Sequence, residues 1–289
     1  VTLTGFSTPP SSGISVVQNA TGDIAIVSAI SVTNLSGIGL LAQETASGVG
    51  NIVVNTTGSV TGTGSGSVGL EAQNVDSSNG GNVSVTATGG VTANQHAIVA
   101  STAGSGNVSV EAGGAIASTV QFGIRAAASG TGNVSVLTDA GSTINSGGAG
   151  ISAINFDTVL AASANSTVTV TNNAVINSGT TLNPSGSVPQ GIAAGFYGAN
   201  GTSNTAINGT VLVNNNANIT AAAGYGVDAY NWGNGDVTLN EAANTSVSGA
   251  QYGLAAYALS KGSGNVAINV GANVALSATT FFGIQAFVN

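Results

Sequence analysis

The sequence predicts an all-β fold, a parallel β-helix of about nine coils with three short strands and roughly 27–30 residues in each coil. Three observations carry this prediction. A tetrapeptide recurs ten times along the 289 residues, two further apolar strand patterns follow it in nearly every coil, and turns rich in Gly, Ser, Thr and Asn separate the patterns. A fixed period in this range indicates a repeat architecture, in which each unit buries its apolar face only by stacking on its neighbours.

The first strand of each coil carries the tetrapeptide, which reads a small residue (usually Gly), then Ile, Leu or Val, then any residue, then Ala. Its start moves from Gly13 to Gly283, 270 residues in nine steps, so the mean period is 30. Because side chains alternate along a strand, the aliphatic residue and the Ala predict a buried stripe. The copies, of which the first and the fourth are degenerate, span 13–16, 39–42, 69–72, 97–100, 123–126, 150–153, 191–194, 226–229, 253–256 and 283–286.

The second strand is usually Asn-Val-Ser-Val or a variant of it, as at 82–85 and 107–110. Its aliphatic residues alternate with polar ones, and their β-branched type suits a pleated surface. The first apolar residues of the nine second strands are Ile24, Ile52, Val83, Val108, Val134, Val168, Val211, Val237 and Val266.

The third strand is short and centres on one β-branched residue. This residue lies eight positions after the first apolar residue of the second strand in seven coils, and ten positions after it in two. The nine central residues are Val32, Val60, Val91, Ile116, Ile144, Ile176, Ile219, Val247 and Val274. Stacked at the usual strand spacing of about 4.8 Å, nine coils predict a rod about 43 Å long.

The chain is expected to form one β-helix, residues 1–289, with four parts: a lead-in over 1–12, regular coils over 13–149, coils with inserted loops over 150–225, and aromatic-rich coils over 226–289. The insertions fall near 155–165, 179–190 and 195–209. Insertions in solenoids map to surface loops, often on a binding face, and surface loops also lengthen without any function. Both readings of these loops stay open.

Composition excludes several functions. Only 4% of the residues are charged, and Arg125 and Lys261 are the only basic residues against ten acidic ones. A net charge of −8 repels phosphate backbones, so we expect no nucleic-acid partner. No Cys is present, which removes disulfides and thiolate metal sites, and no apolar run approaches 18 residues, so no membrane span is expected. Because the chain begins without Met and stops just after a first strand has started, we interpret it as part of a longer protein.

The residues that carry catalysis are sparse. His96 is the only histidine. A Ser–His–Asp site is defined by the geometry of its three side chains, and the position of His96 in the sequence does not indicate such a geometry. A β-helix enzyme would need clustered carboxylates for calcium or acid–base work, but the acids are scattered. Asp228, an outward residue of a first strand, and Asp236, which opens the next second strand, lie at different corners, with Glu241 expected in the following turn. Solvated surface acids are the favoured interpretation of these three residues, and a weak cation site is the alternative. We predict no enzymatic activity, no metal and no cofactor.

Aromatic residues concentrate after residue 190. Tyr230, Tyr257 and Phe287 directly follow the Ala of their tetrapeptides, so alternation predicts an outward aromatic ladder, with Trp232 and Tyr197 on adjacent turns. This ladder is the candidate partner-binding site, because Tyr and Trp are enriched at interfaces; a segment of the same protein that covers the ladder is the other reading. A second set directly precedes the glycine and is expected to stack inward: Phe122, Tyr225, Tyr252 and Phe282.

The outer face of the third strands is rich in Ser, Thr and Asn, as at Thr61, Asn145 and Thr220. Regular Thr arrays of this kind occur on ice-binding β-solenoids. Residues without such groups, among them Gly90 and Ala117, interrupt the array, which favours an ordinary polar surface.

Glycine-rich, cysteine-free and lysine-poor coils with Gly-Ile-x-Ala and Gly-Asn-Val-x-Val strands resemble the passenger region of bacterial autotransporters, the type V secretion family, over residues 13–289. Filamentous haemagglutinin-like secreted proteins are near relatives of that pattern. The resemblance implies a right-handed parallel β-helix, export through the outer membrane, and a location on the bacterial cell surface or in the medium.

The leading functional hypothesis is a non-catalytic adhesin or structural stalk. Its partner would be a protein or glycan on host cells or other bacteria, and self-association is possible. The alternatives are a carbohydrate-active β-helix enzyme, either a polysaccharide lyase or a hydrolase, and an ice-binding β-solenoid.

Overall fold

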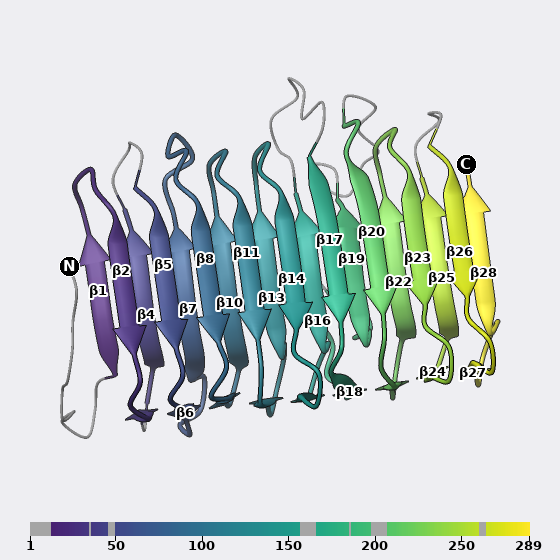
Figure 1. Cartoon of the computed structure of the whole chain (residues 1–289), viewed down its shortest axis with the longest axis horizontal. Coiled ribbons are helices and arrows are strands. Elements are labelled where there is room, and N and C mark those ends of the chain that lie inside the picture. Colours follow the sequence, from purple (N-terminus) through teal and green to yellow (C-terminus); the bar gives the residue numbers. More distant parts are fainter. Residues whose placement is uncertain are drawn as a thin grey trace.

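The computed structural model describes residues 13–34, 36–45, 50–156, 166–184, 186–197, 207–259 and 264–289. Within these ranges the chain forms strands β1 to β28 and no helix, and so no helix there could cross a membrane. Successive coils lie side by side along the long axis of the molecule, from β1 at one end to β28 at the other (Figure 1). The predicted parallel β-helix of about nine coils is confirmed.

Each coil contributes one strand to each of three parallel sheets. The first sheet contains β1 (Ile14–Gln18), β4 (Ile38–Glu44), β7 (Val68–Asn74), β10 (His96–Thr102), β13 (Ile124–Ala128), β16 (Ile151–Asn155), β19 (Ile192–Phe196), β22 (Tyr225–Asn231), β25 (Tyr252–Ala258) and β28 (Ile284–Val288). The second sheet contains β2 (Ile24–Ser28), β5 (Ile52–Thr56), β8 (Val83–Ala87), β11 (Val108–Ala112), β14 (Val134–Thr138), β17 (Thr167–Asn172), β20 (Thr210–Asn215), β23 (Val237–Glu241) and β26 (Val266–Val270). The third sheet contains β3 (Val32–Asn34), β6 (Val60–Gly62), β9 (Val91–Ala93), β12 (Ala115–Ser118), β15 (Thr143–Ser146), β18 (Val175–Ser178), β21 (Ile219–Ala221), β24 (Ser246–Gly249) and β27 (Ala275–Ala278).

The buried stripes predicted from the sequence form columns of stacked side chains. On the second sheet Val83, Val108 and Val134 lie side by side in register and are at most 1% exposed. The ten tetrapeptides of the first sheet align in the same way, from Ile14 on β1 to Ile284 on β28. These columns join into one continuous apolar core along the axis.

One third-strand residue was predicted wrongly. Leu276, rather than Val274, lies in register with Val247. The turn before β27 contains two more residues than the spacing of eight allows, and Asn273 closes this turn with a φ of 58°. Asn244 has a φ of 63° in the coil before, where the sequence spacing was recognised as ten.

The recurring glycine of the tetrapeptide faces the core together with the aliphatic residue that follows it. Gly226 and Val227 are both buried, so the strict alternation of the strand is broken between them. A Cβ on Gly226 would lie 2.3 Å from Cγ1 of Val247 on the third sheet, and a Cβ on Gly150 would lie 2.5 Å from Cγ2 of Ile176. Glycine leaves room for the third-sheet side chain at this corner, and Ala97 is the buried residue at the same position of the fourth tetrapeptide.

The break in alternation places the residue before each glycine on the outer surface. The expectation that Phe122, Tyr225, Tyr252 and Phe282 stack inward is therefore wrong. Tyr225 and Tyr252 are partly exposed and Phe282 is 58% exposed. Phe122 is buried, but it lies outside the continuous core, against His96 and Arg125.

Asparagine at the start of the second strand has a specific structural role. The Oδ1 atom of Asn82 accepts the backbone N–H of Asn107 at 2.9 Å, and Asn107 Oδ1 accepts that of Asn133 at 2.8 Å. In the same way, the Oδ1 atom of Asp236 accepts the backbone N–H of Asn265 at 2.7 Å. The repeated Asn of the sequence thus links the edge of each coil to the next one.

A second polar stack runs inside the solenoid. The Thr138 hydroxyl donates to Asn172 Oδ1, and Asn172 Nδ2 donates in turn to Asn215 Oδ1. The stack ends at Glu241, whose two carboxylate oxygens lie 2.9 and 3.0 Å from Asn215 Nδ2 and which also accepts the hydroxyl of Thr245. Glu241 was expected in a turn, but it is the buried last residue of β23 because its side chain continues this internal stack.

Candidate functional site

The outer face of the first sheet carries a cluster of aromatic side chains over its last strands and the turns beside them. We call this cluster the aromatic patch. Its members come from segments up to 131 residues apart that the solenoid places on neighbouring coils. They are Phe156, Tyr197, Tyr225, Tyr230, Trp232, Tyr252, Tyr257, Phe281, Phe282 and Phe287.

The predicted ladder of Tyr230, Tyr257 and Phe287 is in register on β22, β25 and β28. Its exposure is graded: Tyr230 and Tyr257 are half-buried, and Phe287 is 45% exposed. On β19 the ladder position is Gly195, and a Cβ there would lie 2.5 Å from Cδ2 of Tyr230. The missing side chain lets the Tyr230 ring lie over the backbone of β19.

Tyr197 and Trp232, the other two predicted binding residues, lie beside Tyr230. The ring centroid of Tyr197 is 5.4 Å from that of Trp232 and 6.3 Å from that of Tyr230, both in edge-to-face orientation. Phe156 adds a further edge-to-face contact with Tyr197 at 6.2 Å. Such contacts orient the rings, and Tyr197 still has 37% of its surface exposed.

A second group of rings lies on the same face, near the residues that directly precede the tetrapeptide glycines. Tyr225 and Tyr252 stack with centroids 4.8 Å apart and an interplanar angle of 11°. Tyr252 also stacks on Phe281 at 5.2 Å. Tyr257 meets Tyr225 edge-to-face at 6.5 Å and donates a hydrogen bond of 2.8 Å to Gln285 Oε1, so it connects this group with the ladder.

Asp228 lies between the two groups of rings, at the variable position of its tetrapeptide. Its neighbours in register are Ala193 and Ala255, whose methyl groups can neither donate a hydrogen bond nor carry a charge. The side chain as a whole is partly exposed, but the Oδ1 atom is closed off from solvent and has no hydrogen-bond partner. Burial raises the pKa of Asp228 to about 7.

The tyrosines around Asp228 are held in their neutral form. Burial and, secondarily, the charge of Asp228 raise the pKa of Tyr225 and of Tyr230. The pKa of Tyr257 is raised by burial first and then by its neighbours Tyr225 and Asp228. These three tyrosines of the patch are therefore neutral phenol rings near one carboxyl group.

His96 is the first residue of β10 in the same sheet and does not belong to this patch. Its ring stacks on Phe122 at 5.3 Å, and the guanidinium carbon of Arg125 lies 5.7 Å from the Phe122 ring centroid. Burial, together with the charge of Arg125, lowers the pKa of His96 to about 4, so the imidazole is neutral at pH 7. We assign His96 a packing role.

No group of three or more His, Asp or Glu side chains in the described residues is arranged to hold a metal ion. Asp236 is exposed and accepts hydrogen bonds from Asn265, while Glu241 lies inside the solenoid. Most of the loops near 155–165 and 195–209 lie outside the described residues, and so does the sequence assigned to the lead-in over 1–12.

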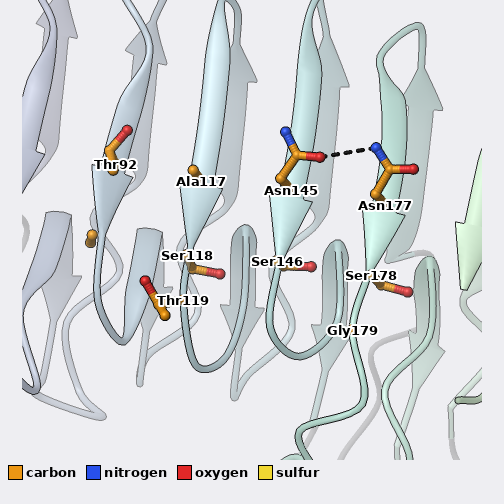
Figure 2. A pocket seen from close by; sticks show the side chains of 10 residues that line it. Thr92, Ala117, Ser118, Thr119, Asn145, Ser146, Asn177, Ser178 and Gly179 are labelled. Carbon is orange, nitrogen blue, oxygen red and sulfur yellow. Dashed lines mark hydrogen bonds between the residues drawn. The ribbon is translucent and has the colours of Figure 1, made fainter. Parts of the chain in front are cut away.

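The outer face of the third sheet carries a shallow hollow instead of an aromatic cluster. Figure 2 shows Thr92, Ala117, Asn145 and Asn177 side by side on neighbouring strands, with Asn177 Nδ2 donating to Asn145 Oδ1 at 2.9 Å. Ala117 interrupts the polar row, as the sequence indicated. The amide groups are bonded to each other along the axis, which leaves a polar surface of mixed side chains.

No protein-family model matches the chain, and no match was found among curated proteins or solved structures. Sequence reasoning placed Tyr230, Tyr257 and Phe287 on the outer face of first strands and Trp232 and Tyr197 on adjacent turns, but it regarded Asp228 as one of ten scattered acids. The signal that distinguishes Asp228 is its position between Tyr225 and Tyr230 with Ala at the matching positions of both neighbouring coils.

Proposed function

We propose that this protein is a non-catalytic binding solenoid that uses the aromatic patch to contact carbohydrate. The observation that carries the proposal is the concentration of partly exposed rings around one carboxyl group on a single face. Exposed apolar clusters with polar groups among them mark interaction sites, and aromatic faces give large contact areas at small entropic cost. The rigid coils below hold the rings at a fixed spacing.

The resemblance to autotransporter passengers extends this proposal to a biological setting. A glycine-rich, cysteine-free β-solenoid suits export through the outer membrane of a bacterium and display on its surface or release into the medium. In that setting the solenoid acts as a stalk or adhesin, and its partner is a glycan of a host cell or of another bacterium.

The alternative functions have weaker support. A β-helix lyase or hydrolase needs carboxylates within reach of one another, whereas Asp228 has no acidic neighbour in register on β19 or β25. Ice binding needs an uninterrupted array, whereas the outer row of the third sheet changes from Thr92 to Ala117 to Asn145.

The proposal is tested with a glycan array, followed by titration calorimetry with each glycan that gives a signal. We expect the triple variant Tyr230→Ala, Tyr257→Ala, Phe287→Ala to bind at least about tenfold more weakly than the parent, because buried aromatic contacts dominate hot spots. A matched control removes exposed apolar side chains from the outer second sheet: Val27→Ala, Val53→Ala and Leu137→Ala.

The control should bind like the parent, and circular dichroism should show the same β spectrum for all three proteins. Equal binding by the triple variant, or a parent that binds no glycan, contradicts the proposal. Cleavage of a bound polysaccharide by the same preparation would instead support the enzymatic alternative.

A further inference from the structure

Asp228 is a partly exposed acidic residue, and one of its carboxyl oxygens has no hydrogen-bond partner in the described part of the chain. Its Oδ1 atom is closed off from solvent and accepts no hydrogen bond. A buried carboxyl oxygen without a donor is costly, and such groups call for an explanation. The alanines at the matching positions of β19 and β25 offer neither charge nor hydrogen bond.

The chain offers no described cation to this carboxylate. Arg125 lies at the same position of the tetrapeptide, but on β13, three strands from Asp228 on β22, which is about 14 Å at the usual strand spacing. Its guanidinium is instead placed over the Phe122 ring. Lys261, the only other basic residue, lies outside the described residues.

The surroundings of Asp228 are suited to a cation supplied from outside. Tyr225 and Tyr257 meet at an interplanar angle of 90°, so one ring turns its face and the other its edge toward the space between them. Tyr230 follows two residues after Asp228 on the same outer face of β22. Cations are attracted to the faces of aromatic rings, and a carboxylate adds a charge-assisted hydrogen bond.

We propose that Asp228 and the tyrosines around it bind the protonated amine of a glucosamine unit within a glycan. This inference rests on the proposed function, and it names the chemical group that the aromatic patch selects. The ammonium group bonds to the carboxylate of Asp228, while the sugar ring lies against the neighbouring phenol faces.

The geometry favours an amino sugar over a basic peptide. The rings beside Asp228 lie on the outer face of the first sheet and are partly exposed. Protein partners place their dominant residues in well-packed pockets, whereas a sugar ring needs only an exposed aromatic face. The tyrosine hydroxyls and Gln285 also supply hydrogen-bonding groups suited to sugar hydroxyls.

The experiment is titration calorimetry at pH 7, where the ammonium form of glucosamine and the ionised form of Asp228 are both populated, with three probes: a β-1,4-linked glucosamine hexamer, its fully N-acetylated counterpart, and a hexalysine peptide. We expect the parent to bind the glucosamine hexamer at least about tenfold more tightly than the acetylated hexamer, because a charge-assisted hydrogen bond is lost on acetylation. In Asp228→Asn this preference should disappear.

The matched control is Asp236→Asn, which removes the same charge at a position where other coils already carry Asn, such as Asn82 and Asn107. It should keep the preference of the parent. The inference is overturned if Asp228→Asn retains the preference, if both hexamers bind equally, if hexalysine binds as tightly as the glucosamine hexamer, or if no probe binds. Binding of the acetylated hexamer through the aromatic patch, without preference for the amine, would sink this inference alone and leave the proposed function standing.

Discussion

The N-terminal and C-terminal coils have the same interior but different outer faces. At the ladder position of the first sheet, Gln43, Gln73 and Ser101 occupy β4, β7 and β10, whereas Tyr230 and Tyr257 occupy β22 and β25. The second and fourth residues of the tetrapeptides on these strands are buried and are aliphatic or Ala in both regions. The core therefore constrains every coil in the same way, and a difference confined to the outer face indicates where this chain carries its specific function.

The largest expected loss of stability tests the shared interior and comes from a charge placed inside one coil. Val134→Asp should lower the free energy of unfolding by about 4 kcal/mol or more, because it buries a carboxylate without a partner. Ser135→Asp, one residue further along β14 and on the outer side, should cost less than about 1 kcal/mol. The urea midpoints of both variants measure the difference, and similar midpoints would refute the assignment of inner and outer faces.

The second prediction concerns the aromatic patch and pH. The pKa of Asp228 is about 7 in the folded protein, against 3.8 as its ordinary value, so the folded state disfavours ionisation. The group then costs nothing below pH 4, and stability falls as pH rises from about 4 to 7. Asp228→Asn removes this loss and should stabilise the protein by about 2–4 kcal/mol at pH 8, but hardly at pH 4.

Urea unfolding of parent and Asp228→Asn at pH 4, 6 and 8 measures this effect. Asp236→Asn, at an exposed position of the second sheet, should show no such pH-dependent gain. A gain that is the same at pH 4 and pH 8 would mean that the charge of Asp228 is not responsible.

A smaller loss of stability tests the shared interior at the first position of the tetrapeptide, where glycine recurs. Gly150→Ala should destabilise the protein by about 1–3 kcal/mol, because the new methyl group would lie 2.5 Å from Cγ2 of Ile176 and 2.6 Å from the carbonyl oxygen of Gly191. Gly283 holds the same position in the last coil, where the nearest atom, Cβ of Leu276, is 3.9 Å away. Gly283→Ala should leave the melting temperature almost unchanged, and equal losses in both variants would exclude crowding as the reason for the repeated glycine.

Most of the fold could be predicted from the sequence because each buried column repeats one residue type at one position of the coil. The ten tetrapeptides and the nine second strands align as expected, since any shift by one residue would turn a column of aliphatic side chains outward. Prediction failed where the backbone departs from alternation. Tyr225 lies outside because the chain bends at Gly226, and Leu276 replaces Val274 because the turn at Asn273 is longer.

The candidate site could be predicted only in part. The outward ladder follows from its position after the Ala, so the register of Tyr230 and Tyr257 was recognisable. The surroundings of Asp228 depend on which residues the coils before and after it place beside it, 35 and 27 positions away in the chain. Coils of unequal length hide such neighbours until the register of every strand is known.

The parallel register also determines how the molecule can form and change in length. In the described residues each strand pairs only with the strands one coil before and one coil after it, so strand pairing joins adjacent coils alone. Folding can then start in any few adjacent coils and spread outward one coil at a time. For the same reason, loss or duplication of a whole coil would shorten or lengthen the rod by about 4.8 Å and leave the remaining coils paired as before.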